Sequence, residues 1–256
     1  MGKSPVYEQP LNERIRSFMR FQHLFRRLDH HVNRSSVWDT HAALSTLLEI
    51  VNLTTRSDIK SEAMKELERQ NVALQQFVNM PSVDERRLAS VMARQKELIH
   101  ELDAQQGQIA QDAAGNEFLN AVKQRAAVSG SACTIDIPAY QYWLHTAIDR
   151  RREQIADWVA PMQTVRAAVD LILEAIRKSS QSSEELATRG FYQQNLNPAR
   201  PLQIVLVSCK DPVAVFPEIS AGKHRFTIRF LQQVSTSLRP EQTTRDIRFL
   251  LTCCCI

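Results

Sequence analysis

The sequence KHRFTIRF at residues 223–230 alternates basic or polar side chains with large apolar ones. Alternation over this length predicts a half-buried β-strand, because successive side chains of a strand point to opposite faces. One face would carry the apolar side chains that pack on a core: Phe226, Ile228 and Phe230. The other face would carry the polar side chains: Lys223, Arg225, Thr227 and Arg229.

The polar face of this strand has two interpretations. Arg225 and Arg229 are four residues apart, which is roughly 13 Å at a strand rise of about 3.3 Å per residue. A solvated outer face of a sheet would explain them, because charged residues mostly face water. A more specific hypothesis is that this polar face is a docking surface for an acidic partner.

The placement of charge along the chain favours a partner with negative charge. The 256 residues carry a formal net charge of +4. The segment from Lys223 onward contains six cations and two anions, so it accounts for the entire net positive charge of the chain. An acidic protein segment, a nucleic acid or a membrane surface would each complement it.

Composition indicates a globular protein without a membrane span. A hydrophobic content of 43% provides enough apolar material for a sizeable core. The N-terminal arginines interrupt any apolar run, so no signal peptide is expected, and no stretch approaches 18 apolar residues. Five cysteines at irregular spacing do not form a disulfide framework, which predicts a cytoplasmic protein with reduced thiols.

Helical periodicity dominates the first two thirds of the chain. Apolar spacing predicts helices over 10–31, 37–53, 58–78, 85–106, 117–128, 149–159 and 161–178, with another beginning at Pro138. A capping box at residues 82–85 would begin the fourth of these, and Gly107 would end it. The first helix also carries a basic stripe, for which a solvated face is the simpler interpretation: Arg16, Arg20, His23 and Arg27.

Strand signals follow a polar, Ser-rich linker at residues 179–185. Candidate strands cover 191–192, 202–208, 224–231 and 245–254, and an early strand at about 132–137 is expected to join their sheet. The fold class is therefore α+β, with a mostly antiparallel sheet. We expect a helical domain of residues 1–130 and 138–180, and a β domain of residues 131–137 and 185–256.

Motifs for catalysis and cofactor binding are missing from the sequence. It contains no GxxxxGK[ST], GxGxxG, GxSxG or HExxH pattern, so we expect no enzyme activity and no cofactor. Four histidines between residues 23 and 41 lack paired Cys or carboxylate ligands, and no metal site is expected. The terminal CCCI at 253–256 resembles a prenylation box, but a strand whose thiols pack as small hydrophobes is the better interpretation.

Several sequence blocks resemble the ZapD family of bacterial cell-division proteins. They occur in the family's order along nearly the whole chain: YEQPLNER at 7–14, KELERQ at 65–70, CTIDIP at 133–138, WLH at 143–145, GFYQ at 190–193, FPEIS at 216–220, HRF at 224–226, IRF at 228–230 and LTCC at 251–254. The chain departs from the family at 103–117, at 233–244 and in its last two residues, outside these blocks.

The resemblance implies a non-enzymatic partner of FtsZ, the tubulin-like protein of the division ring. Proteins of this family have a helical and a β domain, form symmetric dimers and cross-link FtsZ filaments into bundles at mid-cell. They bind the C-terminal tail of FtsZ through a basic surface between the domains. Carried over by position, that surface would include Arg225, Arg229, Lys223, His145, Arg125 and Arg56.

Two other functions compete with this expectation. A nucleic-acid-binding module could use the same basic strand, but RNA-binding sheets place aromatic and basic side chains on one exposed face. Here the phenylalanines of the strand alternate to the face opposite the arginines. An enzyme with an unrecognised site is the second competitor. We therefore expect FtsZ and a second copy of the chain as partners, with no nucleic acid and no membrane insertion.

Overall fold

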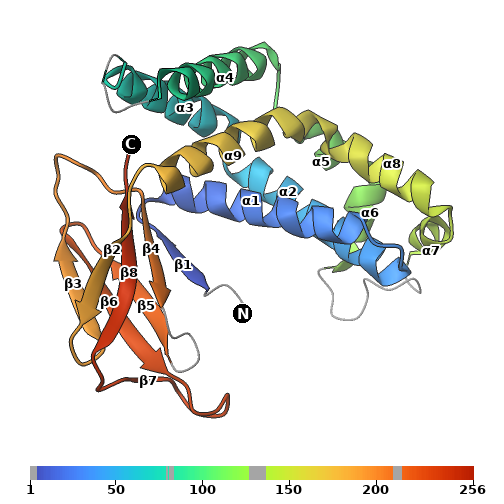
Figure 1. Ribbon diagram of the computed structural model, residues 1–256. Coiled ribbons are helices and arrows are strands. Elements are labelled where there is room, and N and C mark those ends of the chain that lie inside the picture. The colour runs from blue at the N-terminus through green and yellow to red at the C-terminus, as the bar shows by residue number, and fades with distance from the viewer. Residues whose placement is uncertain (1–4, 79, 81–83, 127–136, 210–214) are drawn as a thin grey trace. The chain divides into compact units, whose positions relative to one another are not determined.

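The chain forms two compact units, one helical and one built mainly of strands. The computed structural model describes residues 5–78, 80, 84–126, 137–209 and 215–256. One unit is Ser17–Ile172, and the other combines Met1–Arg16 with Leu173–Ile256 (Figure 1). Helices precede a strand-rich C-terminal region with antiparallel pairing, so the predicted α+β class is confirmed.

The helices follow the predicted periodicity closely. Those of the described residues are α1 (Glu13–Val32), α2 (Val37–Arg56), α3 (Ile59–Gln75), α4 (Glu85–Ala104), α5 (Gln111–Gly115), α6 (Glu117–Ala126), α7 (Pro138–Leu144), α8 (Ile148–Val159), the 3₁₀ turn η1 (Ala160–Met162) and α9 (Gln163–Lys178). Only the one-turn helix α5 was not predicted, because five residues are too short for an apolar period to show.

Local signals at the helix ends explain where several helices begin and stop. Asp84 caps α4, and its Oδ1 accepts a hydrogen bond from the Arg87 N–H at 3.1 Å. The predicted cap, Ser82, lies outside the described residues. Helix α4 ends at Ala104 with Gln105 as an extended C-cap, two residues before Gly107, whose φ is 76°. Pro138 is the first residue of α7, where a missing N–H costs nothing.

The basic stripe on α1 is partly neutralised within the helical unit and at the start of α1. The Arg16 Nε lies 3.2 Å from Glu13 Oε2. Arg27 forms an ion pair with Glu49 of α2, and its Nε donates to the Thr46 hydroxyl at 2.9 Å. Arg27 therefore helps to hold α1 against α2.

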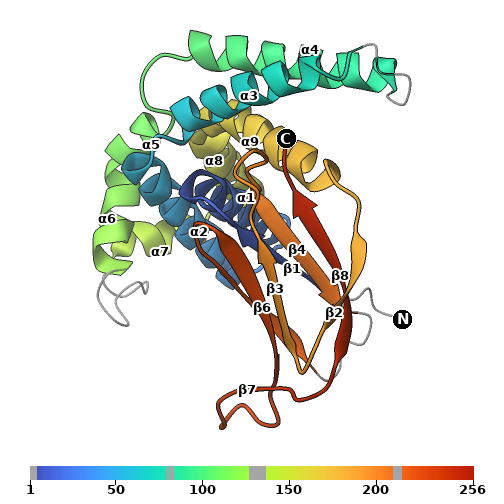
Figure 2. The same cartoon turned by 90° about the vertical axis from the view of Figure 1, so that its left-hand side faces the viewer.

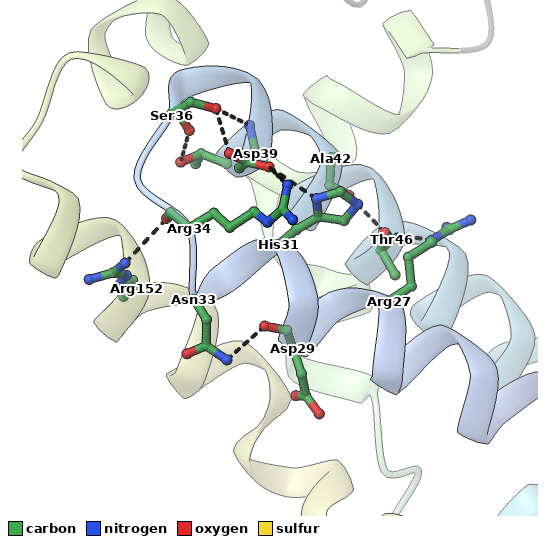
Figure 3. Close-up of polar contacts among 11 residues, drawn as sticks. Arg27, Asp29, His31, Asn33, Arg34, Ser36, Asp39, Ala42, Thr46 and Arg152 are labelled. Carbon is green, nitrogen blue, oxygen red and sulfur yellow. Dashed lines mark hydrogen bonds and ion pairs between the residues drawn. The ribbon is translucent and has the colours of Figure 1, made fainter. Parts of the chain in front are cut away.

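A polar cluster fixes the connection between α1 and α2 (Figure 3). The Ser36 hydroxyl accepts from the Asp39 N–H at 3.0 Å and donates to Asp39 Oδ2 at 2.6 Å. Asp39 Oδ1 also lies 3.3 Å from His31 Nδ1 and 4.0 Å from the Arg34 guanidinium. From α8, Arg152 donates to the Val32 carbonyl at 2.9 Å. The connection is thus held from both sides.

The β unit is a sandwich of two antiparallel sheets (Figures 1 and 2). Its strands are β1 (Val6–Pro10), β2 (Ser183–Ala187), β3 (Phe191–Asn195), β4 (Ile204–Cys209), β5 (Phe216–Ala221), β6 (Arg225–Gln232), β7 (Glu241–Gln242) and β8 (Ile247–Cys254). One sheet has the order β1-β4-β8-β2; the other has the order β3-β6-β5, and β7 also pairs with β6.

The sandwich core confirms the predicted facing of β6. Phe226, Ile228 and Phe230 are each 0% exposed and pack against side chains of β4 and β8 from the facing sheet. The Phe230 and Phe249 ring centroids lie 5.0 Å apart. Because side chains alternate between the two faces of a strand, the β6 residues between these three buried ones lie on the outer face.

Of three segments of the β unit, one predicted strand lies mostly outside the described residues, one predicted linker was partly wrong, and one strand was not predicted. The early strand predicted at about 132–137 lies outside the described ranges except for Ile137, which is the N-cap residue of α7. The linker assigned to residues 179–185 was wrong in its last three residues, which begin β2 and pair with β8. Val6–Pro10 pairs with β4 as an edge strand. Edge pairing of such short segments depends on distant partners, which local sequence does not show.

Truncating the core face of β6 should destabilise the protein without removing any charge. We expect Phe226→Ala and Ile228→Ala each to lower the free energy of unfolding by about 2–5 kcal/mol, because both delete fully buried groups. Urea denaturation measures this loss. The control is Arg225→Gln on the exposed face of the same strand, which should stay within about 0.5 kcal/mol; an equal loss there would contradict the facing of β6.

The α1–α2 connection should contribute stability only while Asp39 is ionised. The Ser36 hydrogen bond, with smaller effects from His31 and Arg34, holds the pKa of the Asp39 carboxyl below its ordinary value. A pKa lowered by folding gives stability that is present above the unfolded value of about 3.9 and is lost as pH falls through the folded pKa. Carboxyl NMR titration should show a low pKa that rises in Ser36→Ala; an unchanged pKa in that variant would exclude Ser36 as the cause.

Candidate partner-binding surface

The outer face of the β3-β6-β5 sheet presents the arginines predicted from the alternation. Arg225 and Arg229 are exposed, and Thr227 between them is half-buried. Residues of the neighbouring strands complete this outer face: Phe191, Gln193 and Asn195 of β3, and Glu218 and Ser220 of β5. We call these residues, with Arg225, Thr227 and Arg229, the outer face of the β6 sheet.

Arg225 lies at the start of β6, and its charge is available to solvent. Its carbonyl accepts from the Gly222 N–H at 2.9 Å, which closes the turn that carries the exposed Lys223. The guanidinium makes no hydrogen bond or ion pair with any residue that the structure describes. Arg225 and Lys223 therefore place two solvated cations at one end of the strand.

Arg229 is paired, unlike Arg225. Its Nη2 donates to Glu218 Oε2, and the two side chains are 54% and 48% exposed. On its other side, Arg229 stands opposite Phe191, which is 42% exposed. One row across the sheet thus carries an apolar ring, a cation and an anion.

Gly190 fixes the start of β3 beside β6. It has a φ of 71°, and a Cβ there would lie 2.6 Å from the Thr243 carbonyl oxygen. Only glycine fits this close approach without strain. The Gly190 carbonyl accepts from the Phe230 N–H at 2.8 Å, and this bond brings Phe191 into register with Arg229.

His145 lies in the helical unit, at the C-cap of α7. The side chain is exposed, and its Nδ1 lies 2.8 Å from the Gln141 carbonyl oxygen. Since a carbonyl can only accept, Nδ1 is the donor in this contact and carries a proton. The contact lies at the C-terminal end of α7.

Helix α7 is anchored firmly although it has only seven residues. The Tyr140 hydroxyl lies 2.7 Å from His41 Nδ1 of α2, and Trp143 Nε1 donates to Gln154 Oε1 of α8 at 2.6 Å. Burial raises the pKa of Tyr140 to about 12, partly opposed by the Arg151 charge, so the phenol stays protonated. These bonds hold His145 in one place on the helical unit.

The remaining predicted site residues also lie on the helical unit. Arg125 is exposed near the end of α6, and Arg56 is the exposed last residue of α2. The structure brings Lys223, Arg225 and Arg229 together in the β unit, whereas His145, Arg125 and Arg56 belong to the other compact unit.

The residues that β3 and β5 add to the outer face were not predicted from the sequence. Phe191 and Glu218 flank Arg229 only because β3 and β5 pair with β6 in one register. The alternation of β6 does send its own phenylalanines inward, yet Phe191 adds an exposed ring beside the arginines. The sheet therefore has an exposed aromatic side chain beside a cation, which β6 alone lacks.

Other chemistry is not assembled in the described ranges. No group of three or more His, Cys, Asp or Glu among these residues is placed to hold a metal ion. Within the same ranges, every helix is too short or too polar to cross a membrane. Burial raises the pKa of Cys253 to about 11 and that of Cys254 to about 12, as expected for thiols packed in the terminal strand β8.

The structure defines an α+β protein that displays exposed basic residues on a sheet face and on its helical unit. A family model described as "ZapD: Cell division protein" matches residues 19–229. Proteins named "Cell division protein ZapD" are similar over nearly their whole length. The one from Methylococcus capsulatus is 39% identical over 254 residues, covering 99% of both chains. Those from Cupriavidus necator and Ralstonia nicotianae are 38% and 39% identical over 250 residues, covering 97% of this chain and 98% of theirs.

The chain belongs to the ZapD family of cell division proteins. The resemblance seen in the sequence blocks is thereby confirmed. A role in cell division follows from the family, and the family's description names no enzymatic activity.

Reversing the charge of Arg225 should abolish partner binding while the fold persists. We expect Arg225→Glu to lose co-sedimentation with FtsZ, because the new carboxylate repels an acidic partner as well as removing an attraction. The matched control is Arg200→Glu, the same change at an exposed loop position of the same unit, which should bind normally. A folded Arg225→Glu protein that still binds FtsZ would place the docking surface elsewhere.

Proposed function

We propose that this protein binds the C-terminal tail of FtsZ and cross-links FtsZ filaments, thereby promoting assembly and stability of the division ring. The observation that carries the proposal is the exposed pair Arg225 and Arg229 on the outer face of the β6 sheet. Arginine forks match carboxylates, and the two arginines lie four residues apart on one face of an extended strand. Membership of the ZapD family supplies the cell-division context.

The helical residues His145, Arg125 and Arg56, and Lys223 in the β unit, are assigned to the same function. Each is exposed, and each carries a positive charge or an imidazole ring. In this proposal the helical domain, residues 1–130 and 138–180, and the β domain, residues 131–137 and 185–256, both contribute to binding the acidic tail. The protein acts in the cytoplasm at mid-cell, and it does so without catalysis.

Cross-linking requires more than one binding surface in each particle. A monomer with one tail-binding surface could decorate filaments but could not join them, so the proposal includes a homodimer that buries part of the helical domain. Light scattering at micromolar concentration should give twice the chain mass. A monomeric mass with bundling intact would contradict the dimer.

A nucleic-acid-binding function is the second candidate. The exposed Phe191 ring beside Arg229 favours it, because bases stack on exposed aromatic side chains next to cations. Phe191 by itself is a small stacking surface. A gel-shift assay with single-stranded RNA and DNA, run beside the FtsZ experiment, separates the two functions.

Filament bundling should depend on the FtsZ tail and on salt. We expect full-length FtsZ to co-sediment with the protein, and FtsZ without its C-terminal tail to remain unbundled. Bundling should weaken as salt rises, because exposed charges are screened over about 10 Å at 0.1 M ionic strength. Equal co-sedimentation of tail-less FtsZ would exclude the tail, and binding that is insensitive to salt would exclude the exposed arginines as the main contact.

A further inference from the structure

Arg225 and Arg229 are not equivalent on the outer face of the β6 sheet. Arg229 stands directly opposite Glu218 of β5, in register and joined by an ion pair. Arg225 stands opposite Asn195 of β3 and lies beside the turn at Gly222, and no acidic residue occupies either position. An acidic segment that meets both arginines therefore meets one free cation and one that is already paired.

The Arg229–Glu218 pair is not needed to hold the sheet together. Both side chains are about half exposed, and pairs of this kind contribute little to folding because water and salt screen them. The core face of β6 is held by Phe226, Ile228 and Phe230 instead. The pair can therefore open when another carboxylate arrives.

An incoming carboxylate at Arg229 meets two effects of Glu218. Glu218 accepts from Nη2, so part of the guanidinium fork is occupied. Its negative charge also repels a second carboxylate that approaches the same guanidinium. On the β3 side, Arg229 is flanked by the uncharged ring of Phe191.

We propose that Glu218 is an intramolecular competitor for Arg229, which lowers the affinity of the outer face for an acidic peptide segment and sets its specificity. The proposal rests on the proposed function in that the natural segment is the FtsZ tail. It follows that Arg225 makes the larger contribution to binding in the natural sequence. When the charge of Glu218 is removed, the whole Arg229 guanidinium is available as a second contact for the acidic segment.

The test compares Glu218→Gln with a matched control. Glutamine keeps the size of the side chain and removes its charge. The control is Glu241→Gln, which makes the same charge change at an exposed position of β7 in register with Gln232 rather than with an arginine. A labelled synthetic FtsZ tail peptide and a labelled oligoglutamate peptide are titrated by fluorescence anisotropy at low salt.

Glu218→Gln should bind both peptides about two- to fivefold more tightly than the natural protein, the range expected from one exposed charge pair. Glu241→Gln should bind as the natural protein does. Arg229→Gln should reduce affinity more in the Glu218→Gln background than in the natural one, which is a coupling that a change in net charge would not produce.

The outcomes separate the competitor role from the identity of the partner. If Glu218→Gln binds oligoglutamate more tightly but neither protein binds the FtsZ tail, the competitor role stands and the proposed function fails. If Glu218→Gln and the natural protein bind both peptides equally, the competitor role is overturned. Equal tightening by Glu241→Gln would also overturn it, because net charge alone would then explain the effect.

Discussion

Burial of one face of β6 is the constraint on which the rest of the β unit depends. Phe226, Ile228 and Phe230 fill the space between two sheets, and each is fully removed from water. Burial of such side chains stabilises by about 1.5–3 kcal/mol each. A shift of one residue would expose all three and bury two arginines, so the register is strongly specified. The basic outer face is thus a direct consequence of how the core packs.

The helical unit exposes its candidate site residues through a different structural arrangement. Helix α7 is too short to be stable alone, since isolated helices below about 12–15 residues are marginal in water. Its buried aromatic side chains, Tyr140 and Trp143, bond to α2 and α8 and hold it in place. His145 at its end is then exposed on a rigid support. Both units therefore combine a rigid apolar interior with positively charged or hydrogen-bonding groups at the surface.

The sequence predicted the features that depend on short-range periodicity. The α-helices other than α5, the strands β6 and β8 and the outward facing of Arg225 and Arg229 all follow from spacing and single-residue chemistry. The edge strands β1 and β2 and the division into two sheets did not, because they depend on pairing between segments far apart in the chain. Glu218 and Phe191 were missed for the same reason. Each is an ordinary exposed residue until strand register places it next to Arg229.

The central claim is that the FtsZ tail contacts the outer face of the β6 sheet. Side-chain NMR of the arginine Nε–Hε groups, assigned by single substitutions, tests it most directly. On addition of the tail peptide, the Arg225 and Arg229 resonances should shift in a saturable way, while that of Arg200 should stay in place. Saturable binding with both strand resonances unmoved would contradict the account.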